Sequence, residues 1–489
     1  MVGERPSDAF FADLKSCVGP KGWISPQASG KYFADPRGRF VGDAVLVVLP
    51  SSTAQVSAVV ALCNAHKIGI IPFGGGTGGS AGHIEFEGRN TIVLSLERMN
   101  TIRSVDIETD TITAEAGCVL ANIQTAAQQI NRRFGLSLAS EGSCTIGGNL
   151  ATNAGGIQVL RYGNARDLCL GIEAVLPDGS ILNDLRPLRK DNTGFDLRNL
   201  LIGSEGALGI ITAATLKLAP HPDETATFMC ALNSPDAAVT LLRDLRTALG
   251  ETVTAFELMS QLGVTLATKH FPSLLDPFDH PHAWYVVADV EGHCGIAAGV
   301  AEVLQAALEA ELIVDAIVAQ SDTQRKSLWA LREFSYEYNM KEGVFCSSDT
   351  AVPTDEITNF ISLTDAVLVG LDSDLRANRY GHVGDGNIHV NVFPPEGISK
   401  DDYLNKKPNM QEDVRTAINN ATEACQGSIS AEHGIGRLKR KDLLQFSDPT
   451  KMATMRAIKV AIDPNNIMNP GALFMPECLD RIDSNRSLQ

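Results

Sequence analysis

The sequence predicts an α+β protein with a glycine-rich N-terminal domain, a ferredoxin-like antiparallel-sheet domain and a C-terminal helical segment. Three observations support this prediction. Glycine clusters interrupt alternating strand and helix patterns up to residue 219, two strand–helix–strand rounds follow a Pro-rich break at 219–222, and helical patterns return from about residue 411. We therefore expect domains at 1–219, 220–420 and 421–489, the last completing the active site and packing on the first.

The first domain alternates between strand and helix signals. Residues 44–50 (AVLVVLP) are typical of a buried strand, and Ser52 or Thr53 can cap the helix that follows. Further strands are expected at 69–73, 90–96, 111–117 and 171–176, with a helix at 119–134.

The second domain repeats one pattern twice. Its first round is the strand 227–232, the helix 235–249 and the strand 253–259, and its second is 283–290, 295–311 and 312–319. Two such rounds are the signature of a split βαβ, ferredoxin-like sheet with helices on one face.

Composition excludes several classes of protein. Acidic residues outnumber basic ones by 58 to 41 in the 489 residues, and no long Lys/Arg run occurs, so we expect no nucleic-acid partner. The ten cysteines form no CxxC pair, which argues against an iron–sulfur or Cys-type zinc site. Free thiols and the lack of a signal-like start or a spanning apolar stretch predict a cytoplasmic protein without a membrane span.

Three glycine-rich loops, at 74–79, 142–156 and 203–209, are the strongest signal in the first domain. Gly74, Gly76 and Gly79 satisfy G-x-G-x-x-G, but residues 80–89 are too short and too glycine-broken for the helix that a Rossmann turn requires. We expect instead that bare backbone from the three loops contacts one extended anionic ligand. The alternative, tight turns between strands, remains open for each loop taken singly.

The motifs PFGGGTGG (72–79), GGNLATNAGG (147–156) and GSEGALGIIT (203–212) resemble the FAD-binding domain of the vanillyl-alcohol-oxidase superfamily. Within it, the chain is similar to the D-lactate and D-2-hydroxyglutarate dehydrogenase branch. The resemblance implies a two-subdomain FAD-binding domain, with the pyrophosphate in the first two loops. Members with covalent flavin carry a histidine in or near the first loop. Thr77 stands there in this chain, so we expect non-covalent FAD, with His83 near enough to test. The implied FAD contacts are Pro72, Gly74, Gly75, Gly76, Thr77, Gly78, Gly79, Gly142, Ser143, Thr145, Gly147, Gly148, Asn149, Thr152, Asn153, Gly155, Gly156, Gly206, Gly209, Ile210, Ile211 and Asn469.

Two histidines flank a hairpin signal in RYGHVGDGNIHVNV (379–392). If Asp385 and Gly386 form a two-residue turn, His382 faces His389 with Cβ atoms roughly 4.5–5.5 Å apart, close enough to share a divalent metal. Asn391 projects from the same face, where it can reach a substrate. The alternative is that these histidines are hydrogen-bonded core residues or a surface pair.

A carboxylate and a further histidine occur in SAEHGIG (430–436). Glu432 is a candidate third ligand that leaves one coordination position open, and His433 is a candidate base. In the resembled family, His382, His389 and Glu432 match the metal-ligand positions and His433 matches the catalytic base. Imidazole and carboxylate suit zinc first, with manganese and iron as alternatives.

These parts predict the oxidation of a 2-hydroxy acid. The metal lowers the hydroxyl pKa, His433 takes the proton, and hydride transfer to flavin N5 yields the 2-oxo acid. Two rival interpretations remain open: a metal-dependent hydrolase that uses the His/His/Glu set, and a non-catalytic flavin carrier. With no second redox motif, we expect an external electron acceptor, namely an electron-transfer flavoprotein, a cytochrome or a quinone. Oligomeric state stays open, with a homodimer as one alternative.

Substrate preference depends on a helix and the strand after it. Arg332 matches the family's carboxylate-binding arginine, while Tyr336 and Ser347 stand where the hydroxyglutarate enzymes carry a small hydroxyl residue and a lysine. The missing positive charge favours D-lactate or another monocarboxylic D-2-hydroxy acid over a dicarboxylic one. Lys341 could supply the charge instead, and Arg332 taken alone could be an ordinary surface arginine.

Overall fold

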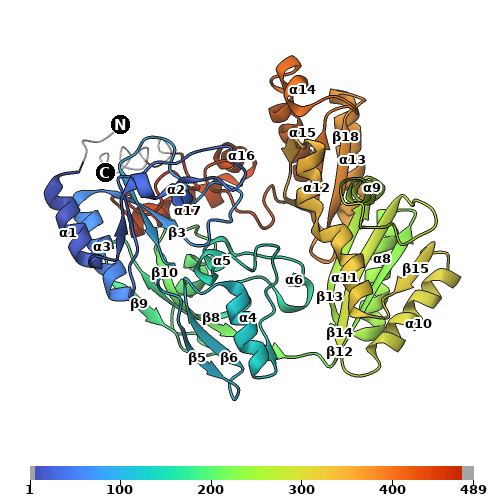
Figure 1. Cartoon of the computed structure of the whole chain (residues 1–489), viewed down its shortest axis with the longest axis horizontal. Helices are drawn as coiled ribbons and strands as arrows, with labels where there is room; N and C mark the ends of the chain where they lie inside the picture. The colour runs from blue at the N-terminus through green and yellow to red at the C-terminus, as the bar shows by residue number, and fades with distance from the viewer. Residues whose placement is uncertain (1–5, 476–478, 480–489) are drawn as a thin grey trace. The chain divides into compact units, whose positions relative to one another are not determined.

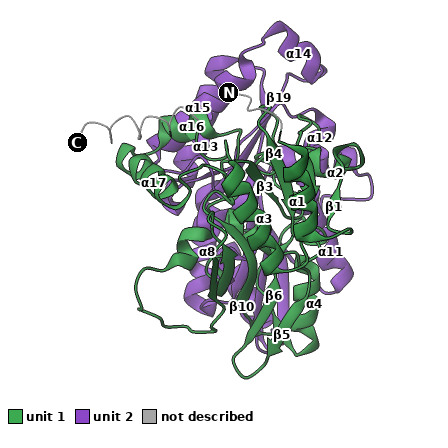
Figure 2. Cartoon of the chain, turned by 90° about the vertical axis from the view of Figure 1, so that its left-hand side faces the viewer, with its two compact units in different colours: residues 1–155, 163–221, 432–489 green, residues 156–162, 222–431 purple. Residues whose placement is uncertain are grey.

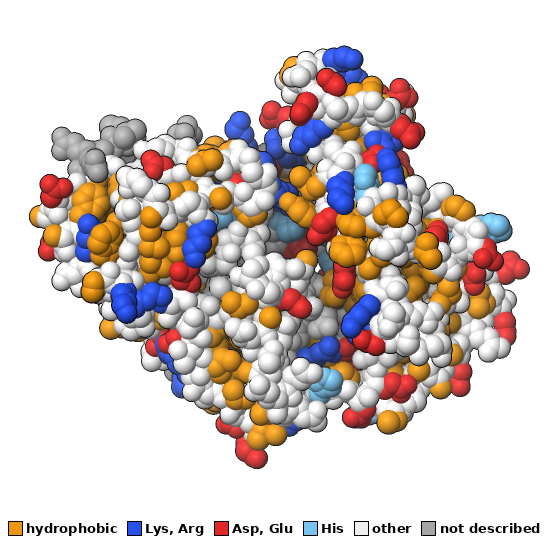
Figure 3. Space-filling view, viewed as in Figure 1, with side chains coloured by type: hydrophobic (Ala, Val, Ile, Leu, Met, Phe, Trp, Pro, Cys, Tyr) orange, Lys and Arg blue, Asp and Glu red, His pale blue; other side chains and the backbone are white. Residues whose placement is uncertain are grey.

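The computed structural model describes residues 6–475 and Leu479. The chain forms two compact units (Figure 2). Unit 1 comprises residues 1–155, 163–221 and 432–489, and unit 2 comprises residues 156–162 and 222–431. Basic and acidic side chains are interspersed on the face shown in Figure 3.

A four-stranded sheet forms the first part of unit 1 (Figure 1). Its strand order is β1-β2-β4-β3, in which β2 and β3 both run parallel to β4. The strands are β1 (Trp23–Ile24), β2 (Leu46–Val48), β3 (Gly69–Phe73) and β4 (Thr91–Ser95). The helices α1 (Asp8–Val18) and α3 (Thr53–His66) share a hydrophobic core with this sheet, and α2 (Gly30–Phe33) contributes to a second core. Ser52 caps α3 by accepting from the backbone N–H of Gln55, which confirms the predicted helix start.

A five-stranded antiparallel sheet, in the order β5-β6-β10-β8-β9, forms the second part of unit 1. Its strands are β5 (Ile102–Asp106), β6 (Thr111–Glu115), β8 (Cys169–Val175), β9 (Ile181–Asp184) and β10 (Ile210–Lys217). The helices of this part and of the C-terminal segment are α4 (Leu120–Gln129), α5 (Ile146–Thr152), α7 (Leu197–Leu201), α16 (Arg440–Phe446) and α17 (Pro449–Ile462). The two sheets confirm the expected two-subdomain construction.

The glycine-rich passage 142–156 differs from the expected loop, because its centre forms α5. Gly147 and Gly148 each disfavour a helix by roughly 1 kcal/mol relative to alanine. Packing outweighs that preference: Ile146 and Leu150 are fully buried, and a Cβ on Gly147 would lie 2.6 Å from the Cβ of Ala116. After β3, by contrast, no helix forms across residues 74–90, as the sequence predicts.

Unit 2 is built on an eight-stranded sheet with the order β15-β12-β14-β13-β18-β19-β16, and β17 also pairs with β19. Its strands are β12 (Glu224–Leu232), β13 (Val253–Ser260), β14 (Trp284–Gly292), β15 (Asp315–Val318), β16 (Cys346–Ser347), β17 (Thr350–Ala351), β18 (Arg376–His382) and β19 (Asn387–Phe393). The first four strands in the sheet have the ferredoxin-like order that the sequence predicts, and the β18–β19 hairpin extends them.

Helices cover both faces of this sheet. On one face the hydrophobic core includes α8 (Pro235–Leu249), α10 (Ile296–Glu309), α13 (Ile357–Leu371) and α15 (Met410–Ala424). On the other face it includes α9 (Gln261–His270), α11 (Asp322–Glu333) and α12 (Ser335–Glu342). The remaining elements are α6 (Val159–Tyr162), α14 (Lys400–Lys406), β7 (Arg132–Arg133), β11 (Ala219–Pro220) and 3₁₀ turns at Pro26–Ala28, Thr354–Glu356 and Val383–Asp385. Among the described residues, no helix is both long and apolar enough to cross a bilayer.

Candidate active site

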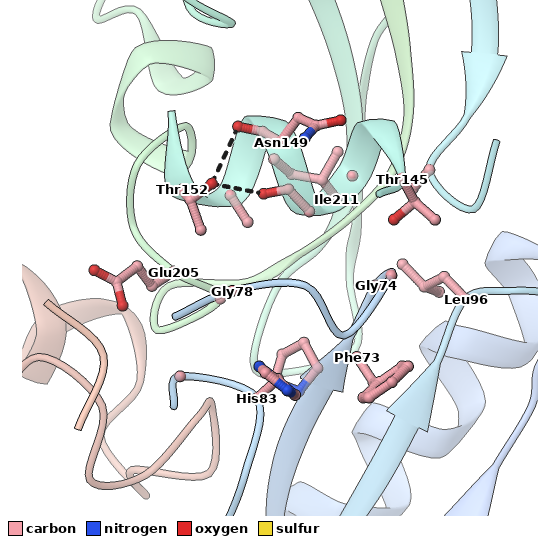
Figure 4. Close-up of a pocket in the computed structure, with 18 of the residues that line it drawn as sticks. Phe73, Gly74, Gly78, His83, Leu96, Thr145, Asn149, Thr152, Glu205 and Ile211 are labelled. Atoms are coloured by element: carbon pink, nitrogen blue, oxygen red, sulfur yellow. Dashed lines mark hydrogen bonds between the residues drawn. The ribbon is translucent and has the colours of Figure 1, made fainter. Parts of the chain in front are cut away.

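A cleft in unit 1 is lined by the loop after β3, by α5 and by the segment that leads into β10 (Figure 4). It holds about 1020 Å³ of space, part of which is open to solvent. Sixteen of the expected FAD contacts line it: Pro72, Gly74, Gly75, Gly76, Thr77, Gly78, Thr145, Gly147, Gly148, Asn149, Thr152, Gly206, Gly209, Ile210, Ile211 and Asn469. Three distant parts of the sequence therefore meet in one cleft.

Six of the expected FAD contacts do not line this cleft. Gly79, Gly142, Asn153 and Gly155 are not among the lining residues, Gly156 belongs to unit 2, and Ser143 lines a neighbouring cavity together with Lys31 and Glu97. Lining residues that the sequence interpretation missed include Phe73, His83, Leu96 and Glu205. His83 was singled out only as a possible flavin attachment point.

Glycine is required here because two backbones approach each other closely. A Cβ on Gly75 would lie 2.3 Å from the carbonyl oxygen of Ser143, and one on Gly74 would lie 2.8 Å from Thr145 Oγ1. Gly76 has φ +70°, a conformation that L side chains rarely adopt. The cleft is thus shaped by backbone packing that tolerates no side chain at these positions.

Several polar atoms in the cleft are buried without a hydrogen-bond partner among the described residues. They are Thr145 Oγ1, Asn149 Oδ1 and His83 Nε2. Leaving such an atom unsatisfied costs about 1–3 kcal/mol, so the cleft is built for a ligand that carries both donors and acceptors. FAD, with its ring edges, ribityl hydroxyls and phosphates, fits that requirement, and Phe73, Leu96 and Ile211 offer apolar contact.

His83 lies in apolar surroundings beside Phe73, with the two ring centroids 5.6 Å apart. Burial lowers the pKa of His83 to about 4, so its imidazole is neutral near pH 7. A neutral ring can donate from one nitrogen and accept at the other, which suits it to contact an uncharged ring edge.

Glu205 joins the C-terminal segment to the cleft. Its carboxylate accepts the backbone N–H groups of Ile435 and Gly436, both at 2.7 Å. Burial raises the pKa of Glu205, and the two backbone hydrogen bonds offset part of that effect. Ser80 Oγ also donates to the carbonyl of His433, at 2.6 Å, and His433 lines the cleft. The glutamate of GSEG is the sequence signal that could have identified this contact.

The turn of the β18–β19 hairpin is longer than the two-residue turn that the sequence predicts, so that prediction was wrong. Its loop spans Val383–Gly386 rather than two residues, so His382 pairs with Asn387 and His389 pairs with Tyr380. The 3₁₀ turn at Val383–Asp385, followed by Gly386 at φ +73°, makes the longer loop. The shift equals two positions, and because side chains alternate with a period of two, His382 and His389 still project from one face.

The two histidines form the core of a candidate metal site. Both are buried, and their ring centroids are 5.8 Å apart in an edge-to-face arrangement. Glu432, the third ligand that the sequence predicts, is the first residue of the unit 1 segment 432–489. Two imidazole nitrogens and one carboxylate form a set that divalent zinc, manganese and iron all accept.

The sequence interpretation missed Glu257. This glutamate is fully buried in β13, where Oε1 contacts His382 Nδ1 at 2.5 Å and Oε2 accepts from Arg332 Nε at 2.9 Å. Burial alone would raise the pKa of Glu257, but His382 and Arg332 lower it to about 2. A single acid within the apolar strand pattern AFELM is the signal that could have identified it, since an unpaired buried carboxylate is rare.

The expected substrate residues lie near this face in different environments. Arg332 is buried at the end of α11, with its guanidinium 4.5 Å from the ring centre of Tyr380. Asn391 is buried, and its Oδ1 accepts from Ser347 Oγ at 2.7 Å. Its Nδ2 has no partner among the described residues. Tyr336 is about half exposed.

Two protein-family models match this chain, one in the N-terminal part and one in the C-terminal part. The model described as "FAD binding domain" matches residues 44–184, and the one described as "FAD linked oxidases, C-terminal domain" matches residues 221–473. A solved structure of p-cresol methylhydroxylase superposes with a TM-score of 0.73 at 17% identity, covering 96% of this chain and 98% of that one. The chain therefore has the vanillyl-alcohol-oxidase type of FAD-binding fold.

Curated relatives show which family with this fold the chain belongs to. The D-2-hydroxyglutarate dehydrogenase of Xanthomonas citri pv. viticola is 34% identical over 91% of this chain and 92% of its own length. A putative mitochondrial D-lactate dehydrogenase of Schizosaccharomyces pombe is 33% identical over 94% of this chain and 88% of its own. The chain belongs to the FAD-linked D-2-hydroxy acid dehydrogenases, enzymes that oxidise a CH–OH donor. The hydrolase and the non-catalytic carrier are therefore not retained.

Proposed function

We propose that the preferred substrate is a D-2-hydroxy acid with a small uncharged side chain, D-lactate or a close analogue. The observation that supports this choice is the hydroxyl–amide pair next to the histidines, in which Ser347 Oγ donates to Asn391 Oδ1. A second carboxylate on the substrate would need a cation at this position, and this chain has a neutral serine there. The nearest alternative, Lys341, has its Nζ 4.0 Å from the ring centre of Phe271.

FAD is held non-covalently in the unit 1 cleft in this proposal, and when bound it supplies the hydride acceptor. The glycine loops let the cofactor approach the protein backbone closely. Thr145 and Asn149 form hydrogen bonds with polar atoms of the cofactor. The neutral ring of His83 contacts it as a hydrogen-bonding partner rather than as a covalent anchor. Acid precipitation that releases all the yellow chromophore into the supernatant would support this, and chromophore retained on the protein would contradict it.

A divalent cation, most suitably zinc, is held in this proposal by His382, His389 and Glu432. When bound, such a cation supplies Lewis acidity that lowers the pKa of a coordinated hydroxyl. His433 takes the hydroxyl proton, a task that suits an imidazole near neutral pH. Oε1 of its neighbour Glu432 lies 3.8 Å from its Nε2.

Arg332 and Asn391 orient the substrate carboxylate. The unpartnered Nδ2 of Asn391 is a buried donor that a carboxylate oxygen would satisfy, and Ser347 fixes the amide so that this donor keeps its direction. Arg332 supplies the positive charge, and Glu257 and Tyr380 hold its guanidinium plane.

D-2-hydroxyglutarate is the second candidate substrate, because the Xanthomonas relative carries that name. A substrate panel on the wild type and on Ser347→Lys separates the two. We expect the wild type to prefer D-lactate, and the lysine variant to shift the ratio of kcat/KM toward the dicarboxylate by about tenfold or more. A wild type that prefers D-2-hydroxyglutarate would overturn the proposal.

In this proposal the reduced flavin passes its electrons to an external acceptor. An artificial dye takes the place of that acceptor in the assay.

A further inference from the structure

One carboxylate in unit 2 links the candidate cation site to the candidate carboxylate site. Glu257 lies in the middle of β13, directly opposite His382 of β18 in the antiparallel register. Each of its two oxygens contacts a different functional residue: Oε1 faces His382 Nδ1 and Oε2 faces Arg332 Nε. One carboxylate therefore connects the two functional residues, with one oxygen for each.

The surroundings of Glu257 are apolar and closed to solvent, and Arg332 has further contacts that hold it in place. Its strand neighbours Phe256 and Leu258 are buried in the apolar core, and Glu257 itself is inaccessible to solvent. Arg332 is held further by donating from Nη1 to Ser335 Oγ at 3.1 Å and by stacking on Tyr380, the cross-strand partner of His389.

We propose that Glu257 is a positioning residue that sets His382 for the cation and Arg332 for the substrate carboxylate at the same time. By accepting a hydrogen bond from Nδ1–H, it fixes the tautomer of His382 in which Nε2 carries the lone pair for a metal. By accepting from Nε–H, it fixes the orientation of the Arg332 fork. The inference rests on the proposed function, which makes His382 a cation ligand and Arg332 the carboxylate-binding residue.

Glutamine at this position cannot perform both tasks. Its oxygen can still accept from one partner, but its amide NH₂ then points a donor at the N–H of the other. Glu257→Gln therefore preserves size while it breaks one of the two contacts. Glu291 provides a matched control, because it is a buried glutamate of the adjacent strand β14 that is paired with Arg161 and lies four positions along the strand from Val287, the residue opposite Glu257.

The test titrates Mn²⁺ into the flavin-loaded, chelator-treated full chain and follows free Mn²⁺ by electron paramagnetic resonance. We expect Glu257→Gln to weaken Mn²⁺ binding by about 10- to 100-fold, the usual cost of losing the partner of a metal-binding histidine. Glu291→Gln should stay within about twofold of the wild type. We also expect Glu257→Gln to raise KM for D-lactate, and to raise it no further in an Arg332→Met background.

His389→Ala distinguishes failure of this inference from failure of the proposed function. If His389→Ala loses Mn²⁺ but Glu257→Gln binds it as the wild type does, the inference is overturned and the cation site stands. If His389→Ala also binds Mn²⁺ normally, the cation site itself is wrong. Equal loss in Glu257→Gln and Glu291→Gln would show a general packing effect and would also overturn the inference.

A measurement on the wild type covers the case in which Glu257→Gln does not fold. Nitrogen-15 NMR of the metal-free protein at mildly alkaline pH reports which ring nitrogen of His382 carries the proton. We expect the Nδ1-protonated tautomer, and the Nε2-protonated tautomer would reject the proposal. Glu257→Asp, which is one methylene too short to contact both partners, should weaken Mn²⁺ binding in the same direction.

Discussion

Two candidate sites differ in what forms them: the candidate flavin cleft of unit 1, and the face of the β18–β19 hairpin in unit 2 that carries His382 and His389, here called the histidine face. The cleft is formed mainly by backbone, because Gly74, Gly75 and Gly147 sit where any Cβ would collide with a neighbouring strand or loop. The histidine face is formed by side chains on a hairpin whose backbone pairing is ordinary. Substitutions in the first region should therefore destroy its shape, whereas substitutions in the second should remove chemistry and leave the fold intact.

The largest effect is expected for Gly75→Ala. The new Cβ would lie 2.3 Å from the Ser143 carbonyl and 2.7 Å from Cys144 Cα, so one backbone segment must move. We expect FAD affinity to fall more than about 100-fold and the protein to purify colourless, measured by flavin absorbance per chain. The matched control is Gly142→Ala, where a Cβ meets no atom within 4 Å. Equal flavin content in both variants would contradict the backbone account of the cleft.

His389→Ala should produce the opposite pattern. We expect kcat for D-lactate to fall at least about 100-fold, because the proposed function makes His389 a cation ligand, while the flavin content stays at the wild-type level. Removing the cation from the wild type with a chelator should reproduce this loss, and re-adding Zn²⁺ or Mn²⁺ should restore activity only in the wild type. Loss of flavin in His389→Ala would show that the two regions do not behave separately.

The smallest effect concerns His83 and pH. Its folded-state pKa of about 4 lies below the ordinary value of 6.5, so its contribution to stability is present above pH 6.5 and is lost as pH falls from 6.5 toward 4. We expect His83→Gln to flatten the acid-side decline in the urea midpoint of unit 1, followed by flavin fluorescence. The exposed His221→Gln should leave that decline unchanged. A decline of the same steepness in His83→Gln would contradict the role of burial.

Sequence patterns were sufficient for much of the fold. The strand at Gly69–Phe73 and the helix at Pro235–Leu249 have the predicted bounds, because each combines a clear apolar pattern with a turn or cap signal. The ferredoxin-like order followed from two repeated strand–helix–strand rounds. The short helix α5 was missed because its glycines oppose a helix locally, and contacts with Ala116 far away in the sequence decide its conformation.

The candidate site was predictable where residues cluster in the sequence, and less so where contacts are made through space. His382 and His389 could be placed on one face because that conclusion needs only an even spacing around a turn. Their register could not, since it depends on whether Val383 and Gly384 continue the strand or enter the loop. Glu257 and Glu205 were missed because each acts on a residue more than 70 positions away, and single-sequence patterns carry no information about such pairs.

The segmented construction of unit 1 sets the order in which the molecule can mature during translation. Asn469 and His433 line the candidate cofactor cleft, and Met468 bridges to Ile70 of β3, so the cleft needs residues that are synthesised after unit 2. Residues 222–431 of unit 2 are complete before that point. A nascent polypeptide that has not yet reached Asn469 therefore lacks part of the lining of the candidate flavin cleft, although the residues of unit 2 are already present.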